Sequence, residues 1–262
     1  MDRHAAITFV RSAGDLIEQA CLDYLLDSVP PPETVTQQLF QDQREDGGCS
    51  PFWAPDYSSL DATCFHLAQA EQLGIATGDA AVRRALSFLA YRQRQDGSWE
   101  EDETLAEQAP PWARPGDLEA RLYLTANCGF WLAVSGDHSE QAGRAASYLL
   151  VFLDDEGVLP GFAHTRWLAG GLWYRLNFPQ SERVFTSLEG SLEELAASSL
   201  SWLLSTLLLA GVPSDHPLIE AVASRLLALQ EPDGRWPSED GPQRDVHATL
   251  EALRVLDLCH QL

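Results

Sequence analysis

Apolar residues recur along this chain at helical spacing, and the helical segments fall into two classes that alternate. In one class a charged face lies opposite an apolar face, as in AAVRRALSFLAYRQ at 80–93. The segments of the other class are more apolar. Amphipathic helices are predicted at 34–43, 80–94, 138–153, 181–190 and 216–230. Apolar helices are predicted at 59–73, 117–135, 164–176, 194–211 and 245–258, after one N-terminal helix near 5–27.

The alternation predicts two layers, with the apolar helices inside and the amphipathic helices outside. No segment alternates with period two and β-branched enrichment, so we expect an all-α fold. Repeated helical hairpins must stack to bury their faces, either as an open solenoid or as a closed ring. An inner helix that is apolar on both faces favours closure around a cavity. The predicted fold is therefore an (α/α) toroid, a two-layer helical barrel of about five to six hairpin repeats.

A short phrase recurs where an outer helix ends. It reads QREDGGC at 43–49, QRQDGSW at 93–99 and QEPDGRW at 230–236, with a degraded copy, LDDEGVL, at 153–159. We call these four segments the staple loops. Gly supplies the positive φ of the turn, and Gln and the aromatic residue can tie neighbouring hairpins by hydrogen bonding and burial. The phrase is interpreted as structural and carries no chemistry by itself.

The charge composition indicates which classes of binding partner are not expected. The 262 residues carry 39 acidic side chains against 17 basic ones, all of them Arg, for a net charge of −22. Nucleic acids and anionic membrane surfaces attract clustered positive charge, so neither is an expected partner. The acidity itself reads as a solvated surface.

No linker rich in Pro, Gly or Ser divides the chain, so one domain is expected over 1–262: an N-terminal helix within 1–30 and repeats over 31–262. Five scattered Cys without a C-x-x-C pair, and an N-terminus without the apolar core of a signal peptide, predict a cytoplasmic protein. The stretch 195–214 has no charge. A membrane span and a buried helix both fit it, and the comparable apolar segments elsewhere favour the buried helix.

Q-x-x-D-G-x-W between an outer and an inner helix resembles the QW repeat of the terpenoid cyclase and protein prenyltransferase superfamily. The resemblance covers roughly 35–258 and is strongest over 35–180. There the chain looks like a single-domain relative of the β-type catalytic domain of class II terpene cyclases of the squalene-hopene cyclase type. The resemblance implies the toroid, and it implies an activity much less specifically.

Class II cyclases protonate an alkene with the middle Asp of a D-x-D-D motif, and this chain has no intact copy. SLDAT at 59–63 keeps that Asp as Asp61, whereas DVHAT at 245–249 has His247 in its place. The resemblance implies Asp61 as the acid and His247 as its orienting partner. Asp117, which begins another inner helix, is a reserve acid, and Asp245 is a further alternative. An Asp in a first helical turn is more often a cap, so the repeat that carries the acid stays open.

An alkene is a weak base, so its protonation needs a strong acid in a dry pocket, and the resulting cations need aromatic faces. The expected substrate-binding residues lie on inner helices: Phe65, Tyr123, Asn127, Trp131, Trp167, Trp173, Tyr174 and Trp202. Aromatic residues at helical spacing are as often core as cavity wall, and that alternative stays open for each of them.

Other chemistries of the superfamily are poorly supported. There is no D-D-x-x-D, and His247 and Cys259 lie 12 residues apart on the last predicted helix, a poor spacing for zinc, so no metal and no cofactor is expected. The predicted function is protonation-initiated cyclisation of a linear isoprenoid or a prenylated (meroterpenoid) chain. The alternative is a non-enzymatic toroid that binds an isoprenoid or a partner, having lost the D-x-D-D acids. A hydrophobic isoprenoid is the expected partner; transient membrane contact during uptake and the oligomeric state stay open.

Overall fold

The computed structural model describes residues 1–259, and within this range the regular structure is helical. It comprises twelve α-helices and four short 3-10 helices. The β-type pairing described consists of two isolated bridges, Gln43 to Cys49 and Cys49 to Ser59. The predicted all-α class is confirmed.

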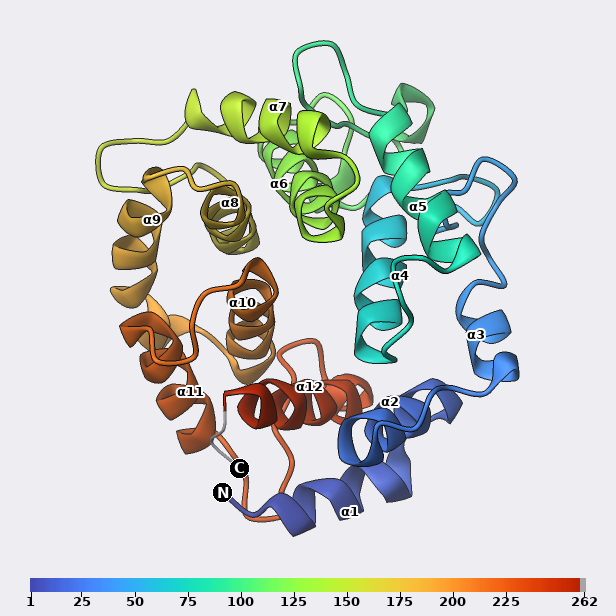
Figure 1. Ribbon diagram of the computed structural model, residues 1–262, viewed down its shortest axis with the longest axis vertical. Helices are drawn as coiled ribbons and strands as arrows, with labels where there is room; N and C mark the ends of the chain where they lie inside the picture. The colour runs from blue at the N-terminus through green and yellow to red at the C-terminus, as the bar shows by residue number, and fades with distance from the viewer. Residues whose placement is uncertain (260–262) are drawn as a thin grey trace.

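The helices form two concentric rings (Figure 1). The inner ring contains α2 (Leu16–Asp27), α4 (Leu60–Gln72), α6 (Leu118–Ser135), α8 (Ala163–Arg175), α10 (Ala197–Ala210) and α12 (Asp245–Leu258). The outer ring contains α1 (Arg3–Ala13), α3 (Glu33–Leu39), α5 (Ala80–Tyr91), α7 (Ser139–Leu150), α9 (Gln180–Glu189) and α11 (Pro217–Ala228). Each inner helix contacts the next one, and α12 contacts α2, so the ring closes as an (α/α) toroid.

The predicted N-terminal helix at 5–27 is wrong in one respect, because the structure has two helices there. Gly14 ends α1, and Asp15 begins α2 through a capping box in which Asp15 and Glu18 exchange hydrogen bonds. Helix α1 packs on α12 and α2 lies in the inner ring, so this segment is itself a hairpin of the toroid. The signal was in the sequence: Gly-Asp-x-x-Glu marks the end of one helix and the start of the next.

The apolar segment 195–214 forms the buried inner helix α10. Its side chains pack against α8, α11 and α12, and most of them are inaccessible to solvent. Within residues 1–259, no helix combines the length and the apolar character that a membrane crossing requires.

The staple loops connect neighbouring hairpins as predicted. Gln93 Nε2 donates to the carbonyl of Gly97 at 3.0 Å and to that of Gln141 in α7 at 2.9 Å. Trp99 is fully buried, and its Nε1 donates to the carbonyl of Leu89 at 2.7 Å. Gly97 has φ +92°, and a Cβ there would lie 2.7 Å from a carbonyl oxygen of α7, so close packing also requires glycine.

Equivalent bonds occur at the other loops that contain Gln. Gln43 Nε2 donates to the carbonyl of Ala81 in α5 at 2.8 Å. Gln230 Nε2 donates to the carbonyl of Asp2 at 3.1 Å, and the Asp2 N–H returns a bond to Gln230 Oε1 at 2.7 Å. The last staple loop therefore binds the N-terminus of α1, and this contact joins the two ends of the ring.

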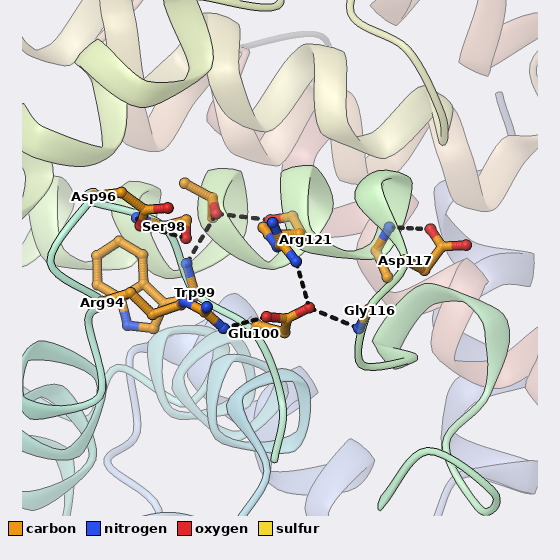
Figure 2. Close-up of polar contacts among 10 residues, drawn as sticks. Arg94, Asp96, Ser98, Trp99, Glu100, Gly116, Asp117 and Arg121 are labelled. Atoms are coloured by element: carbon orange, nitrogen blue, oxygen red, sulfur yellow. Dashed lines mark hydrogen bonds and ion pairs between the residues drawn. The ribbon is translucent and has the colours of Figure 1, made fainter. Parts of the chain in front are cut away.

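On three of the inner helices, α4, α6 and α12, a threonine fixes the helix against the staple loop before it. The backbone N–H groups of Cys49, Trp99 and Trp236 donate to the hydroxyls of Thr63, Thr125 and Thr249 at 2.9, 3.0 and 3.0 Å; Figure 2 includes the bond from Trp99. The shared bond sets one register for α4, α6 and α12.

Candidate active site

The common register identifies three equivalent positions, each two residues before the threonine. They are Asp61 on α4, Tyr123 on α6 and His247 on α12. The sequence predicted that Asp61 and His247 are equivalent, and the threonine bonds support this. Because the loops precede the N-termini of these helices, all three residues lie near the same end of the inner ring.

Asp61 lies in the first turn of α4 and is partly buried. Tyr123 OH donates to Asp61 Oδ1 at 2.9 Å, and Trp112 Nε1 donates to Oδ2 at 2.9 Å. Asn127 Nδ2 donates in turn to the Tyr123 oxygen at 3.2 Å. Burial raises the pKa of Asp61, while the hydrogen bonds from Tyr123 and Trp112 act in the opposite direction. Burial thus shifts the carboxyl group towards its neutral form, and two donors are in place for the anion.

Trp112 reaches Asp61 from the long loop between α5 and α6, and the sequence analysis missed it. A short 3-10 helix, Pro111–Ala113, presents the indole, and a small apolar cluster beneath it contains Ala54, Leu105, Ala109 and Ala113. The apolar residues within a polar loop were the available signal, since a solvated loop has no need of them.

Glu100 joins the two ends of this loop. Its carboxylate accepts from the Gly116 N–H at 2.7 Å and from Arg121 Nη2 at 2.8 Å, and it also pairs with Arg94 (Figure 2). The side chain of Glu100 is 8% exposed. Because these bonds connect the start of the loop with its end and with α6, they restrict where Trp112 can lie.

An aromatic cluster adjoins Tyr123. His164, in the first turn of α8, lies with its ring centroid 4.7 Å from Trp167 and 4.5 Å from Trp202. The centroid of Tyr123 is 6.4 Å from that of His164. Burial lowers the pKa of His164, although the charges of Glu239 and Asp240 oppose this. The cluster therefore combines the predicted residues Trp167 and Trp202 with a neutral imidazole that sequence reasoning missed.

Two of the predicted substrate-binding residues face the outer ring and not the site. Trp173 is fully buried, and its Nε1 donates to the carbonyl of Ala146 in the outer helix α7 at 3.1 Å. Tyr174 packs on Phe185 of the outer helix α9, with ring centroids 5.8 Å apart. Both residues lie between the two rings, so the structure does not bring them to Asp61.

Two further predicted residues follow the site residues along the same helices. Phe65 comes one turn after Asp61 on α4 and is 45% exposed. Trp131 comes one turn after Asn127 on α6 and packs edge-on against Phe130 at 5.6 Å. Each therefore lies on the same face of its helix as the site residue, one turn further towards the C-terminus of the helix.

The alternative acids have other contacts. Asp117 is exposed and caps α6, accepting from the Ala120 N–H at 3.0 Å (Figure 2). Asp245 is 4% exposed, pairs with Arg235 at 3.2 Å and accepts from the Ser238 N–H at 2.8 Å. Both act as local structural groups in this conformation.

His247 is partly buried, and the orienting role predicted for it is filled differently. The hydrogen bonds to Asp61 found within residues 1–259 come from Tyr123 and Trp112. The reason lies in the ring geometry: α6 is adjacent to α4, whereas α2 separates α4 from α12. Of the two equivalents of Asp61, the one on the neighbouring helix makes the contact.

A second charged cluster lies further along the inner helices. Arg254 of α12, 7% exposed, donates to Glu71 of α4 at 2.8 Å and to Glu251 at 3.0 Å. It also donates to Ser205 of α10. Two carboxylates thus neutralise one guanidinium, and the cluster ties three inner helices together.

The site is open to solvent at Phe65 and Trp112, which are 45% and 37% exposed. Two hollows, of about 460 and 340 Å³, lie on the outside, between a staple loop and the next outer helix, α7 or α5. Within residues 1–259 no group of three His, Cys, Asp or Glu side chains is arranged to hold a metal ion. What the Asp61 site offers chemically is a carboxyl group, its hydrogen-bond donors and aromatic faces.

Comparison with known proteins gives structural matches only. No family model and no curated protein matches the chain. The type II terpene cyclase MstE from Scytonema, in complex with geranylgeranyl dihydroxybenzoate (substrate), is 17% identical with a TM-score of 0.60, covering 98% of this chain and 96% of that chain. The apo enzyme gives 18% identity and a TM-score of 0.57, covering 98% and 97%.

A protein from Actinoplanes is 18% identical with a TM-score of 0.55, covering 94% of this chain and 90% of its own. At such identities the likeness establishes the fold, an (α/α) toroid like that of type II terpene cyclases. It does not by itself extend to the activity.

Proposed function

We propose that this protein is a class II-type cyclase that protonates a linear isoprenoid or prenylated chain, with Asp61 as the acid. The observation that carries the proposal is the carboxyl group of Asp61, which begins an inner helix beside aromatic rings and accepts hydrogen bonds from Tyr123 and Trp112. The likeness to MstE, whose structures contain geranylgeranyl dihydroxybenzoate as substrate or merosterolic acid A as product, supports it.

The site suits proton transfer to an alkene. Burial raises the pKa of Asp61, which makes its carboxyl group easier to protonate than an exposed Asp. As the O–H bond breaks, the π electrons of the alkene form a C–H bond and leave positive charge on the more substituted carbon. The anion left on Asp61 is stabilised by Tyr123, Trp112 and the dipole at the start of α4.

The neighbouring rings suit the later steps. Each further alkene attacks the cation to close a ring, and the partly exposed ring of Trp202, which packs on the buried Trp167, stabilises the charge. The final cation loses a proton to restore an alkene. His164, whose lowered pKa keeps its imidazole uncharged at neutral pH, is placed to accept that proton. The substrate chain itself must exclude water, since the site is open.

The test is product formation. The purified protein is incubated with a panel of linear polyprenyl and prenyl-aromatic substrates, and products are identified by mass spectrometry and NMR. We expect a cyclised isomer of the same mass as one substrate, formed without added metal. If every substrate in the panel is bound yet recovered unchanged, the cyclase proposal is wrong.

The second candidate is a toroidal module that binds an isoprenoid without turning it over. It is favoured by the loss of the D-x-D-D acids flanking Asp61 and by the openness of the site, where Phe65 is 45% and Trp112 37% exposed. Under this alternative, a prenylated ligand quenches tryptophan fluorescence and raises the melting temperature, but its mass and its NMR spectrum stay unchanged.

A further inference from the structure

A second carboxyl group lies directly behind Asp61 and has no part in the mechanism above. Glu101, two residues after Trp99, is 3% exposed. Its Oε1 accepts from Ser59 Oγ at 2.6 Å, from the Leu60 N–H at 2.8 Å and from the Asp61 N–H at 3.3 Å. Its Oε2 is buried and has no hydrogen-bond partner among the described residues. Burying a carboxylate oxygen without a partner is costly, so a bare anion is disfavoured there.

The chain contains a matched case without this burial. Glu239 follows Trp236 by three residues, and its Oε1 accepts from Ser199 Oγ at 2.7 Å at the start of α10. Glu239 is exposed, and no orphaned oxygen is found on it. A carboxyl group after the staple loop can therefore bond to the start of an inner helix without being sealed in. The sealing of Glu101 is specific to the hairpin that carries Asp61.

The titratable side chains that α4 and α6 contribute around Glu101 and Asp61 carry no positive charge. They are Asp61 and Cys64 on α4, and Cys128 and Tyr123 on α6. The two thiols are buried and lie 3.8 Å apart. The preceding residue, Glu100, is already paired with Arg121 and Arg94. Burial raises the pKa of Glu101 to about 7, and the negative charge of Asp61 acts in the same direction.

We propose that Glu101 is a positioning residue for the Asp61 proton: the two carboxyl groups form a coupled pair that retains one proton through neutral pH. This inference rests on the proposed function. Two nearby carboxyl groups that interact release their protons in two separated steps. A charge on either carboxyl group disfavours ionisation of the other, so the pair holds on to one proton that Asp61 can deliver. The carboxyl group of Glu101 also fixes the first turn of α4 and thereby the position of Asp61.

The first experiment measures the pH profile of kcat/KM for Glu101→Gln. The amide oxygen can still accept the three bonds at the start of α4, but the charge is gone. We expect the alkaline limb, where Asp61 loses its proton, to move about 1 pH unit lower, as expected for removal of a neighbouring like charge. Glu239→Gln removes the carboxylate charge that accepts from Ser199 at the start of α10, and it should leave the alkaline limb in place. An unchanged limb in Glu101→Gln overturns the proposal.

Glu101→Asp covers the case in which Glu101→Gln folds but is inactive. It retains the charge, so at least partial recovery of the wild-type alkaline limb supports the pair. If Glu101→Asp is active with the limb as low as expected for an uncharged neighbour, the proposal fails.

The second experiment needs no substrate and thus separates this inference from the cyclase proposal. A group whose folded pKa is raised contributes stability below its unfolded pKa, and that stability is lost as pH rises through the folded pKa. For Glu101 the loss runs from about pH 4.5 to above pH 7. Relative to wild type, Glu101→Gln should therefore gain melting temperature between pH 5 and pH 8.

The coupling is tested by repeating this comparison in an Asp61→Asn background. Without the Asp61 charge the pKa of Glu101 falls, so the gain from Glu101→Gln should shrink there. An equal gain in both backgrounds shows that the two groups titrate independently and overturns the inference, whether or not a cyclised product is ever found.

Discussion

The hairpin that ends in α4 and the hairpin that ends in α12 share a scaffold but differ in what they carry. In both, a threonine accepts a bond from the staple loop, at 2.9 Å for Thr63 and 3.0 Å for Thr249. Two residues before the threonine stand Asp61 in one and His247 in the other. Asp61 accepts from α6 and from the loop above it, whereas Asp245, which begins α12, is held by Arg235.

The difference shows where chemistry can arise in a repeat fold. The bonds that stack the hairpins recur at α4, α6 and α12, so they cannot distinguish one of these sites from another. The distinguishing features are additions to one hairpin: the loop that carries Trp112, the sealed Glu101 and the neighbour Tyr123. A variant that affects the shared scaffold should thus change stability, and one that affects the additions should change turnover.

The largest effect is expected for Asp61→Asn, which keeps the shape of the side chain but removes the acid. Cyclisation should fall by a factor of about 10²–10⁴, because positioned proton transfer contributes that much, while substrate binding persists. The measurement is the single-turnover rate by mass spectrometry. Asp245→Asn is the matched control in the other hairpin and should retain turnover per folded molecule. The opposite pattern would move the acid to α12.

Next in size are Trp99→Ala and Trp236→Ala, which remove fully buried indoles from the shared scaffold. Each should lower the free energy of unfolding by about 3–5 kcal/mol through lost burial and the cavity left behind. Denaturant titration followed by circular dichroism measures this. Similar losses in the two variants support equivalent hairpins, and a loss near zero in either would show that its indole is dispensable.

A smaller effect is expected for Tyr123→Phe, which removes one donor to Asp61. Loss of a donor to a developing anion lowers kcat by about 10²-fold. His247→Ala is the control from the equivalent position on α12 and should change kcat much less, because the donors to Asp61 are Tyr123 and Trp112. If His247→Ala were the slower variant, the role assigned to Tyr123, stabilising the Asp61 anion, would be wrong.

The smallest effect is expected for Asp117→Asn. Asp117 is exposed and accepts from the Ala120 N–H at the start of α6. Asn caps helices about as well, so the cost should be at most about 1 kcal/mol of stability with normal turnover. Thermal unfolding and product formation measure both quantities. A dead but folded Asp117→Asn variant would make it the acid instead of Asp61.

Much of the fold could be predicted from the sequence, because its signals are local. The ten predicted helices after residue 30 begin and end within a few residues of the observed ones. The Gln and Gly of the staple loops act through their own backbone neighbours, so their role follows from spacing. Asp15 and Glu18 show that the one wrong boundary was also locally encoded.

The site could be predicted less well, because it depends on which way an apolar helix faces. Helix α8 is apolar nearly all round, so periodicity cannot tell Trp167, beside His164, from Trp173, which bonds to the outer ring. Trp112 and Glu101 lie outside the inner helices, and their contacts with α4 join segments about 40 to 50 residues apart. No local pattern records such contacts. The acid itself stays a prediction until its variants are measured.

The bond between Gln230 and Asp2 has a consequence for how the ring is assembled. It joins residues 228 positions apart, and α1 covers α12, the last helix of the ring. During synthesis α1 emerges before the other helices of the ring, and its packing partner α12 emerges after them. The intervening hairpins can stack on one another as they appear, but the seam between α1 and α12 must wait until α12 has been made. Until then both ends of the stack expose apolar faces, so closure of this seam is expected to be a slow step of folding.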